Sequence, residues 1–449
     1  MRSLKQITAI AAVVATAALA APAGAAPAPE KPFVPGEILV SFGKGGEQLV
    51  DLPPGVGVGE AAQALRANPE VAYAVPNYLA RASAVPNDPG RRGEPGGWRH
   101  MQWNFLPCGS SCGQSANPLS FESPGGINAI DAWTTIKRRT GRASGKFVRV
   151  AVLDTGIAFR GLKPNFKRSP DFARKQFMAP RDFVDGGKLA LDRDGHGTHI
   201  AGTIAERNNN GVALTGLAPA AKIIPVRVLD ANGYGTARDI ARGIVYAAKR
   251  GARVINMSFE FSSAVRSCKR IRGVCRAIRF ATKRRGALVV AAAGNSAGQA
   301  VAFPARAPRV IAVGRTTRDG CVAAASRSGE GLDLVAPGGG APAVKDCGAP
   351  GPDSTDPIRQ LTFKGIGFKQ FGYPGIYEGT SMAAAHVSGV AAMVISSRVL
   401  GNRPKWWKVQ CQLKATARTE RLGQTYDPTA FGSGLVDAAA AVAARAPDC

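Results

Sequence analysis

The chain has few acidic side chains and few histidines. Its 449 residues include 31 Asp and Glu against 58 Lys and Arg, together with four His, which gives a formal charge of +27 at pH 7. A charge of this sign and size favours nucleic acid, an anionic cell wall or acidic substrates as partners. The basic residues are not interleaved with aromatic residues in any motif, so an arginine-rich soluble surface is the simpler interpretation.

Long apolar runs are also missing beyond the N-terminus. After residue 21 no stretch reaches the roughly 18 consecutive apolar residues of a membrane helix, so we expect no membrane span in the mature chain. Apolar residues nevertheless make up 45% of the chain, which excludes a disordered protein. Glycine and proline follow no triplet period and no internal repeat occurs, which excludes a collagen-like chain.

The N-terminus has the pattern of a secretory signal peptide. Arg2 and Lys5 precede an apolar stretch at 7–21, and Ala23-Gly24-Ala25 supplies the small residues of a cleavage site. We therefore expect residues 1–25 to be removed and the protein to be secreted and extracellular.

The cysteines number eight, and an even count in an oxidising compartment predicts disulfides. Eight cysteines allow many connectivities, and we expect sequence neighbours to pair, as 108–112, 268–275, 321–347 and 411–449. No paired CxxC units occur, so a zinc ribbon is not expected.

Residues 26–84 form a small segment with a composition of its own. Strands are predicted at 37–42 and 71–79, on either side of a helix at 60–67, which indicates an α+β unit. Residues 1–83 hold six basic and six acidic side chains, so the remainder of the chain carries all of the net charge. A G-x-G-x-x-A pattern at 57–62 lacks the acidic residue of a dinucleotide site, and we interpret it as a glycine-rich turn.

Residues 85–449 alternate apolar strands with amphipathic helices. This pattern predicts an α/β fold, a doubly wound, mostly parallel sheet with helices on both faces. The expected strands are 147–153, 222–228, 253–257, 287–292 and 309–313. The expected helices are 237–250, 268–285, 380–398 and 434–444. Residues 338–378 are rich in glycine and proline, and we expect a long surface insertion there.

Four polar residues stand at strand ends or helix starts, where α/β proteins place their sites. Asp154 ends an apolar strand, glycines flank His196, Ser381 opens an apolar helix, and Asn295 follows the strand at 287–292. Each residue taken alone could be a helix cap or a turn residue. Together they supply an orienting acid, a base, a nucleophile and an oxyanion donor, in the chain order Asp, His, Ser of one known arrangement of the catalytic triad.

A metal site is the alternative explanation of the histidine cluster. His196 and His199 share one helix face, and Asp192 or Asp194 could complete a ligand set. No third His or Cys follows nearby and no HExxH motif occurs. We therefore expect His199 to be structural.

Three motifs resemble those of the subtilisin-like serine proteases (subtilases), of the secreted bacterial subtilisin and thermitase type. They are Asp154-Thr155-Gly156, His196-Gly197-Thr198-His199 and Gly379-Thr380-Ser381-Met382-Ala383. The resemblance covers about residues 86–445 and implies a monomeric serine endopeptidase that acts on polypeptides through an acyl-enzyme. It also implies that Asp154, His196, Ser381 and Asn295 are catalytic, and that residues 26–84 are a fold-assisting, inhibitory prosegment removed by the enzyme itself.

Substrate-binding residues follow from the same resemblance. Two edge strands would hold an extended peptide, and small residues would wall and floor a primary pocket with room for a sizeable apolar side chain. The strands are Gly233-Tyr234-Gly235 and Ser258-Phe259-Glu260, the walls Ala292, Ala293 and Gly294, and the floor Ala302. The family commonly has glycine at Glu260, whose carboxylate would select basic or polar residues or point to solvent. It also has proline at Ala385, and alanine there leaves a helix intact.

Calcium is the cofactor that the resemblance implies, in a structural role and not for the chemistry. Residues 208–216 resemble the calcium loop of the family, with Asn210, Val212 and Leu214 as ligands. Asp88 or Gln102 could supply a further ligand. An Asp after the first strand of the body could correspond to either Asn165 or Asp171. A polar turn without an ion is the alternative.

A second class of function is a non-catalytic, subtilase-like protein that binds an anionic cell-wall polymer or nucleic acid through its charge. Such proteins usually lose a member of the triad, whereas every catalytic position of this chain is filled. We therefore expect an enzyme, with anionic wall components or acidic substrates as further partners.

Overall fold

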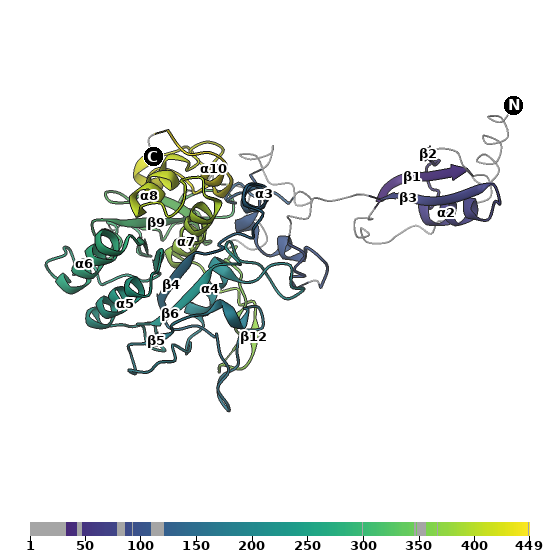
Figure 1. The fold of residues 1–449 in the computed structure, drawn as a ribbon. Coiled ribbons are helices and arrows are strands. Elements are labelled where there is room, and N and C mark those ends of the chain that lie inside the picture. Colours follow the sequence, from purple (N-terminus) through teal and green to yellow (C-terminus); the bar gives the residue numbers. More distant parts are fainter. Residues whose placement is uncertain are drawn as a thin grey trace. The chain divides into compact units, whose positions relative to one another are not determined.

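The computed structural model of the chain describes residues 33–42, 47–78, 86–91, 93–108, 121–298, 300–344, 347, 356–365, 367–447 and 449. The chain divides into two compact units, residues 1–83 and 84–449 (Figure 1). Residues 1–25, the predicted signal peptide, lie outside the described residues.

The smaller unit is a three-stranded antiparallel sheet covered by one helix. Its strands β1 (Phe33–Phe42), β2 (Glu47–Asp51) and β3 (Val71–Tyr78) lie in the order β2-β1-β3. Helix α2 (Val58–Arg66) buries Ala61, Ala62 and Leu65 against the sheet. These residues recur at helical spacing, so one apolar face forms and packs. The unit has the predicted α+β architecture, with β2 as an additional strand.

The larger unit is built on a seven-stranded sheet in the order β10-β9-β8-β7-β4-β6-β5, and every neighbouring pair is parallel. The strands are β4 (Arg149–Asp154), β5 (Arg181–Asp182), β6 (Lys222–Arg227), β7 (Val254–Met257), β8 (Leu288–Ala292), β9 (Val310–Thr316) and β10 (Leu334–Pro337). The predicted parallel α/β sheet is confirmed. The short strands β5 and β10 were not predicted, because two and four residues carry little periodicity.

Both faces of the sheet are buried under helices. Val150 and Val152 of β4 point into one core, whereas Ala151 and Leu153 point into the other. The first core is covered by α3 (Ala129–Thr140), α4 (His196–Ala205), α7 (Thr380–Ser397), α8 (Trp406–Ala415) and α10 (Ala438–Ala443). The second is covered by α5 (Ala237–Lys249) and α6 (Arg272–Arg279), which continues into a π-helical turn (Phe280–Arg284). This doubly wound arrangement explains why the strands are apolar throughout.

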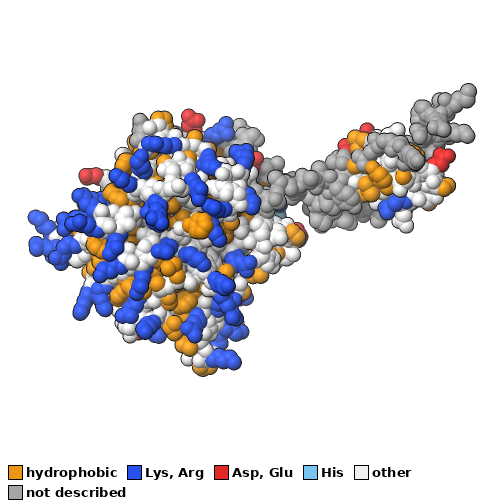
Figure 2. Space-filling view, in the orientation of Figure 1, with side chains coloured by type: hydrophobic (Ala, Val, Ile, Leu, Met, Phe, Trp, Pro, Cys, Tyr) orange, Lys and Arg blue, Asp and Glu red, His pale blue; other side chains and the backbone are white. Residues whose placement is uncertain are grey.

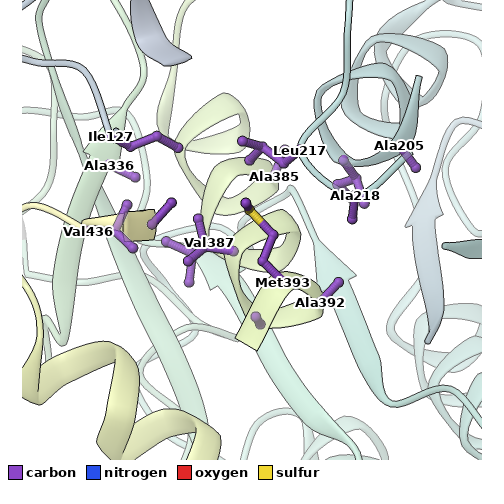
Figure 3. Close-up of a cluster of buried hydrophobic side chains, with 14 of the residues drawn as sticks. Ile127, Ala205, Leu217, Ala218, Ala336, Ala385, Val387, Ala392, Met393 and Val436 are labelled. Atoms are coloured by element: carbon purple, nitrogen blue, oxygen red, sulfur yellow. The ribbon is translucent and has the colours of Figure 1, made fainter. Parts of the chain in front are cut away.

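Helix α7 lies in the centre of the first core. Figure 3 shows its residues Ala385, Val387, Ala392 and Met393 in the buried cluster. Among the described residues α7 alone is long and apolar enough to cross a membrane by length and composition, but 83% of it is buried inside the unit. A helix that is apolar on all sides belongs to a protein core as readily as to a bilayer, and its burial identifies α7 as a core helix.

The glycine- and proline-rich stretch at 338–378 is not simply a surface insertion. Ile358, Gln360 and Thr362 are buried, and β11 (Thr362–Phe363) pairs with β12 (Phe371–Gly372). The Thr362 hydroxyl donates to the Gly195 carbonyl at 2.6 Å, at the start of α4. The glycine and proline content did not predict this role, because it indicates the flexibility of the backbone and not which side chains are buried.

Three of the predicted disulfides are present, Cys268–Cys275, Cys321–Cys347 and Cys411–Cys449. The predicted pair 108–112 involves Cys112, which lies outside the described residues.

Candidate active site

The predicted catalytic residues gather where the strand order changes direction. From β4 the chain builds β6 and β5 on one side and β7 to β10 on the other. The loops that leave the carboxyl ends of β4 and β7 therefore separate, which opens a crevice. Asp154 ends β4, Ser258 follows β7 and Asn295 lies three residues after β8, so all of them lie along this crevice.

His196 is the first residue of α4, and its Nδ1 lies 2.7 Å from Asp154 Oδ1. The same carboxylate oxygen accepts a hydrogen bond from the Thr155 backbone N–H at 2.8 Å. Gly197 makes the approach possible, because a Cβ there would lie 2.1 Å from the Gly156 carbonyl oxygen. The glycine after the histidine is thus required by the contact between the helix and the end of β4.

Asp192 joins the two loops that carry Asp154 and His196. Its Oδ1 accepts from the Thr155 hydroxyl at 2.8 Å and the Gly195 N–H at 3.0 Å, and its Oδ2 accepts from Thr198 N–H at 2.9 Å. All of its oxygens are thus engaged by the protein. Among the described residues the two histidines belong to no group of three or more His, Cys, Asp or Glu suited to a metal ion, so the alternative of a metal site at the histidines gains no support.

The two histidines of α4 differ in their electrostatics. Burial alone would lower the pKa of His196, but the charge and hydrogen bond of Asp154 outweigh it and raise that pKa. Burial lowers the pKa of His199 to about 3. Its Nε2 donates to the Ile358 carbonyl at 2.9 Å and its ring stacks on Tyr377. His199 is therefore neutral and structural.

Ser381 is the second residue of α7, so it lies in the positive potential at the start of an 18-residue helix. Its Oγ donates to the Ser258 carbonyl at 3.0 Å, and the Ser258 hydroxyl donates to the Ser381 carbonyl at 2.8 Å. Asn256 extends this network, donating to Ser258 Oγ and accepting from Ser388 of α7, both at 2.9 Å. Asn256 was missed, although a polar residue inside a buried strand is a visible signal.

Asn295 is held by the start of α7. Its side-chain oxygen accepts from the Thr380 N–H at 2.9 Å and the Thr380 hydroxyl at 3.2 Å. These bonds fix the orientation of the amide and leave Nδ2 as a donor toward the cavity that Asn295 and Ser381 both line.

The cavity has a volume of about 340 Å³ and contains most of the predicted site. It is lined by Thr155, Asp194, His196, Leu229, Gly233, Ser258, Phe259, Glu260, Ala292, Gly294, Asn295, Thr380 and Ser381. Of the predicted substrate-binding residues, Tyr234, Gly235, Ala293 and Ala302 are not among them. Ala293 faces the opposite core, because side chains alternate along the extended chain.

The two predicted edge strands are not strands in this structure, since both 233–235 and 258–260 are irregular. Neither alternative expected for Glu260 is found. Its carboxylate is not left free to bind a basic substrate side chain, and it does not point to solvent. Its carboxylate forms an ion pair with Arg327 at 2.9 Å. The cavity is also lined by residues that the sequence analysis did not select. Three of them lie in or beside the recognised motifs and could have been selected for that reason, namely Thr155, Asp194 and Thr380. Nothing in the sequence indicates Leu229.

The loop at 208–216 is closed around two buried carboxylates. Asp88 accepts from the backbone N–H groups of Asn209 and Asn210. Asp171 accepts from Asn210 Nδ2 at 2.8 Å and from the Leu214 N–H at 3.2 Å. The structure thus brings Asp171, and not Asn165, to this loop.

A third buried carboxylate lies near this loop. Burial raises the pKa of Asp171 to about 8, and burial together with the charges of Asp171 and Asp88 raises that of Glu206. Gln102 is also present, where it accepts from the Thr215 N–H at 3.0 Å. Crowded carboxylates with amide and carbonyl oxygens are hard-oxygen donors of the kind that calcium prefers.

Comparisons with known proteins identify the family of the chain. A model described as the Subtilase family matches residues 145–434. Alkaline elastase YaB of a Bacillus strain is 37% identical over 318 residues, 71% of this chain and 70% of the relative. Subtilisin Savinase of Lederbergia lenta is 36% identical over 320 residues, 71% and 98% of the two chains.

A solved protease structure from Pseudoalteromonas arctica has a TM-score of 0.60 and 30% sequence identity, and the match covers 81% of this chain and 100% of that one. The family match spans more than half of the chain and includes the Asp154, His196 and Ser381 motifs. The chain is therefore a serine endopeptidase of the subtilase family.

Proposed function

We propose that this enzyme cleaves polypeptides through Asp154, His196, Ser381 and Asn295 and is secreted as a zymogen that processes itself. The 2.7 Å contact between His196 Nδ1 and Asp154 Oδ1, beside the cavity that Ser381 lines, is the observation that carries the proposal. Three disulfides agree with an oxidising, extracellular destination.

The chemistry begins at Ser381. Its Oγ attacks the scissile carbonyl carbon while His196 Nε2 takes the hydroxyl proton. Asp154 accepts the hydrogen bond of Nδ1–H, which keeps Nε2 as the basic nitrogen and stabilises the imidazolium that forms. The imidazolium then gives its proton to the leaving amine, and an acyl-enzyme remains. Water activated by His196 releases the acid product.

Asn295 stabilises the negative charge that develops on the substrate carbonyl oxygen. Its amide is oriented by Thr380, and its Nδ2 donates together with the Ser381 backbone N–H at the start of α7. Because these donors are fixed before the reaction, they stabilise the oxyanion without a cost of reorientation.

The substrate binds as an extended strand along residues 233–235 and 258–260. Neither segment belongs to a sheet in this structure. Tyr234 already uses its N–H and C=O for Asp230, so an extended peptide would pair with the other backbone groups of these segments. The segment 26–84 is the first such substrate in this proposal. Its cleavage between Leu79 and Val85 falls outside the described residues.

A structural calcium ion would be held by Asp88, Asp171 and Asn210 with the carbonyls of Val212 and Leu214. Calcium there would compensate the burial, and the lesser mutual repulsion, that raise the pKa values of Asp171 and Glu206. It would also fasten the segment around Asp88 to the loop. Its contribution is to stability, since every group with a role in the chemistry lies elsewhere.

An anionic partner is a second candidate, supported by a basic hollow of about 780 Å³. Its lining includes Arg142, Lys146, Arg149, Arg253, Arg285, Arg398 and Arg403, with no acidic residue. Arg149 is the first residue of β4, and Arg253 and Arg285 precede β7 and β8. The hollow therefore lies at the amino ends of the strands, opposite Ser381. Figure 2 shows far more Lys and Arg than Asp and Glu on the visible face of the larger unit.

Arg253 is the centre of the electrostatic argument for this hollow. Burial and the neighbouring charge of Arg403 lower its pKa, and its Nε is buried without a hydrogen-bond partner in the described structure. Among the described residues none of the seven cations forms an ion pair. Uncompensated buried charge is costly, so an oxyanion with several charges, such as the phosphates of a wall polymer, would bind here.

Replacement Ser381→Ala should abolish hydrolysis and self-processing together, because no acyl-enzyme can form. The expected loss in kcat is about 10⁶-fold, a magnitude measured for the corresponding serine of subtilisin itself. N-terminal sequencing should find the wild type starting near Ala84 and the variant retaining the segment 26–84. Ser396→Ala, at the far end of α7, is the matched control. Trimming of the purified variant at the same bond, without other proteases, would contradict self-processing.

Activity should fall with decreasing pH as His196 becomes protonated. Because the pKa of His196 is raised above its usual 6.5, the acidic limb of kcat/KM should have an apparent pKa above that value. Asp154→Asn removes the charge that raises it and the acceptor that fixes the tautomer, so kcat should drop by about 10⁴-fold. A limb that stays above 6.5 in a still active Asp154→Asn variant would refute the proposed pairing.

Calcium should raise the melting temperature, and chelation should lower it. Calcium at about 1,000 times its Kd contributes about 4 kcal/mol to the free energy of unfolding. Calorimetry of Ser381→Ala protein with calcium or EDTA measures this without self-digestion. Asp171→Asn should remove most of the calcium response, whereas Glu330→Gln, outside the loop, should keep it. An equal response in both variants would place the ion elsewhere.

Inorganic tripolyphosphate should bind the basic hollow of Ser381→Ala protein, with affinity that falls as salt is added. Titration calorimetry should show that Arg253→Gln with Arg403→Gln weakens binding at least 10-fold. The control Arg238→Gln with Arg270→Gln removes the same charge outside the hollow and should change affinity by less than 3-fold. Equal losses in both pairs would mean diffuse attraction and no site. Comparing a teichoic acid with free polyphosphate then separates a wall polymer from a soluble anion.

A further inference from the structure

Glu260 and Arg327 form an ion pair inside the cavity wall beside Ser381. Glu260 Oε2 lies 2.9 Å from Arg327 Nη2, and the two side chains are 28% and 7% exposed. Glu260 follows β7 and lines the cavity together with His196 and Ser381. This pair is a feature of the chain that the catalytic chemistry does not use.

The Glu260 carboxylate spans the gap between the two backbone segments that border the cavity. Its Oε1 accepts from the Asn295 N–H at 3.0 Å, so a residue after β7 is tied to one after β8. Gly294, at φ +113°, leaves no room between them, since a Cβ there would lie 2.6 Å from both Arg327 Cδ and Glu260 Oε2. The space beside Ala292 and Gly294 is thus partly filled by charged atoms.

The pair is anchored from both ends. Arg327 donates from Nη1 to the Ala300 carbonyl at 3.2 Å and from its backbone N–H to the Gly294 carbonyl at 3.0 Å. Separating a mostly buried carboxylate from its guanidinium leaves an uncompensated charge, which is strongly unfavourable. A substrate side chain will therefore fit around this pair more readily than it will displace it.

The substrate residue before the scissile bond must extend into this space. The carbonyl carbon of that residue lies at Ser381 Oγ and its oxygen at Asn295 Nδ2. The adjoining side chain then enters between the segment 258–260 and the cavity-lining residues Ala292, Gly294 and Asn295. We propose that the Glu260–Arg327 pair restricts this pocket to small, uncharged side chains such as Gly, Ala and Ser. The inference rests on the proposed roles of Ser381 and Asn295.

The mutual neutralisation of Glu260 and Arg327 determines which other substrate side chains the pocket rejects. A Lys or Arg side chain gains little from Glu260, because Arg327 already occupies that carboxylate. A large apolar side chain would have to desolvate the pair or push it aside. In this proposal the pocket takes a small side chain, and not the sizeable apolar one that its small walls suggested.

The test compares peptides that differ only in the residue before the scissile bond, which is Ala, Phe or Lys. The wild type should cleave the Ala peptide with the highest kcat/KM. Glu260→Gly with Arg327→Ser removes both halves of the pair and should shift the Phe-to-Ala ratio toward Phe by roughly 10–100-fold, the scale of pocket-size discrimination. Glu260→Gln keeps the volume and should keep the preference for Ala within about 3-fold.

Glu378→Gln is the matched control, because Glu378 contacts a different arginine, Arg315, and does not line the cavity; its ratio should equal that of the wild type. A wild type that prefers Phe or Lys, or a folded double variant with an unchanged ratio, would overturn the inference. Should the double variant not fold, the wild-type and Glu260→Gln profiles still decide. If the wild type cleaves none of the peptides and matches Ser381→Ala, the proposed function fails instead.

Discussion

The contact between α4 and the end of β4 is the constraint on which the site depends. His196 reaches Asp154 at 2.7 Å only because Gly197 lets the helix backbone approach Gly156. Asp192 fixes that approach by accepting hydrogen bonds from both loops, and Thr362 closes it from the side. The position of the imidazole therefore depends on contacts between separate segments of the chain. A change at any one of these contacts would loosen it.

The features that the sequence could predict are those with a local cause. Strands buried on both faces are apolar throughout, so β4, β6, β7, β8 and β9 were recognisable within a few residues of their bounds. Polar residues at the end of such strands or within a few residues after it are conspicuous, which is why Asp154 and Asn295 could be identified without coordinates. The cysteine pairs with short intervening segments were predictable because nearby residues in a chain meet often.

The features that escaped prediction depend on contacts between distant residues or on the direction of a side chain. Ala292 and Ala293 are chemically identical, yet one lines the cavity and the other faces the opposite core. Asp192 could have been a metal ligand by its place beside the histidines in the sequence, whereas in the fold its carboxylate ties together the two loops of the site. Nothing near Glu260 in the sequence indicates Arg327, because the fold alone brings the segment after β7 and the loop before β10 together.

Two arginines of this basic protein have the same side chain but different functions. Arg327, at the carboxyl ends of the strands, has a carboxylate partner, so its charge is neutralised and it contributes shape to the pocket. Arg253, at the amino ends, has cationic neighbours and forms no ion pair among the described residues, so its charge stays uncompensated. Because opposite charges nearby cancel the field of the first and like charges reinforce the second, selectivity for the substrate and attraction of an anion can reside at opposite edges of one sheet without interfering.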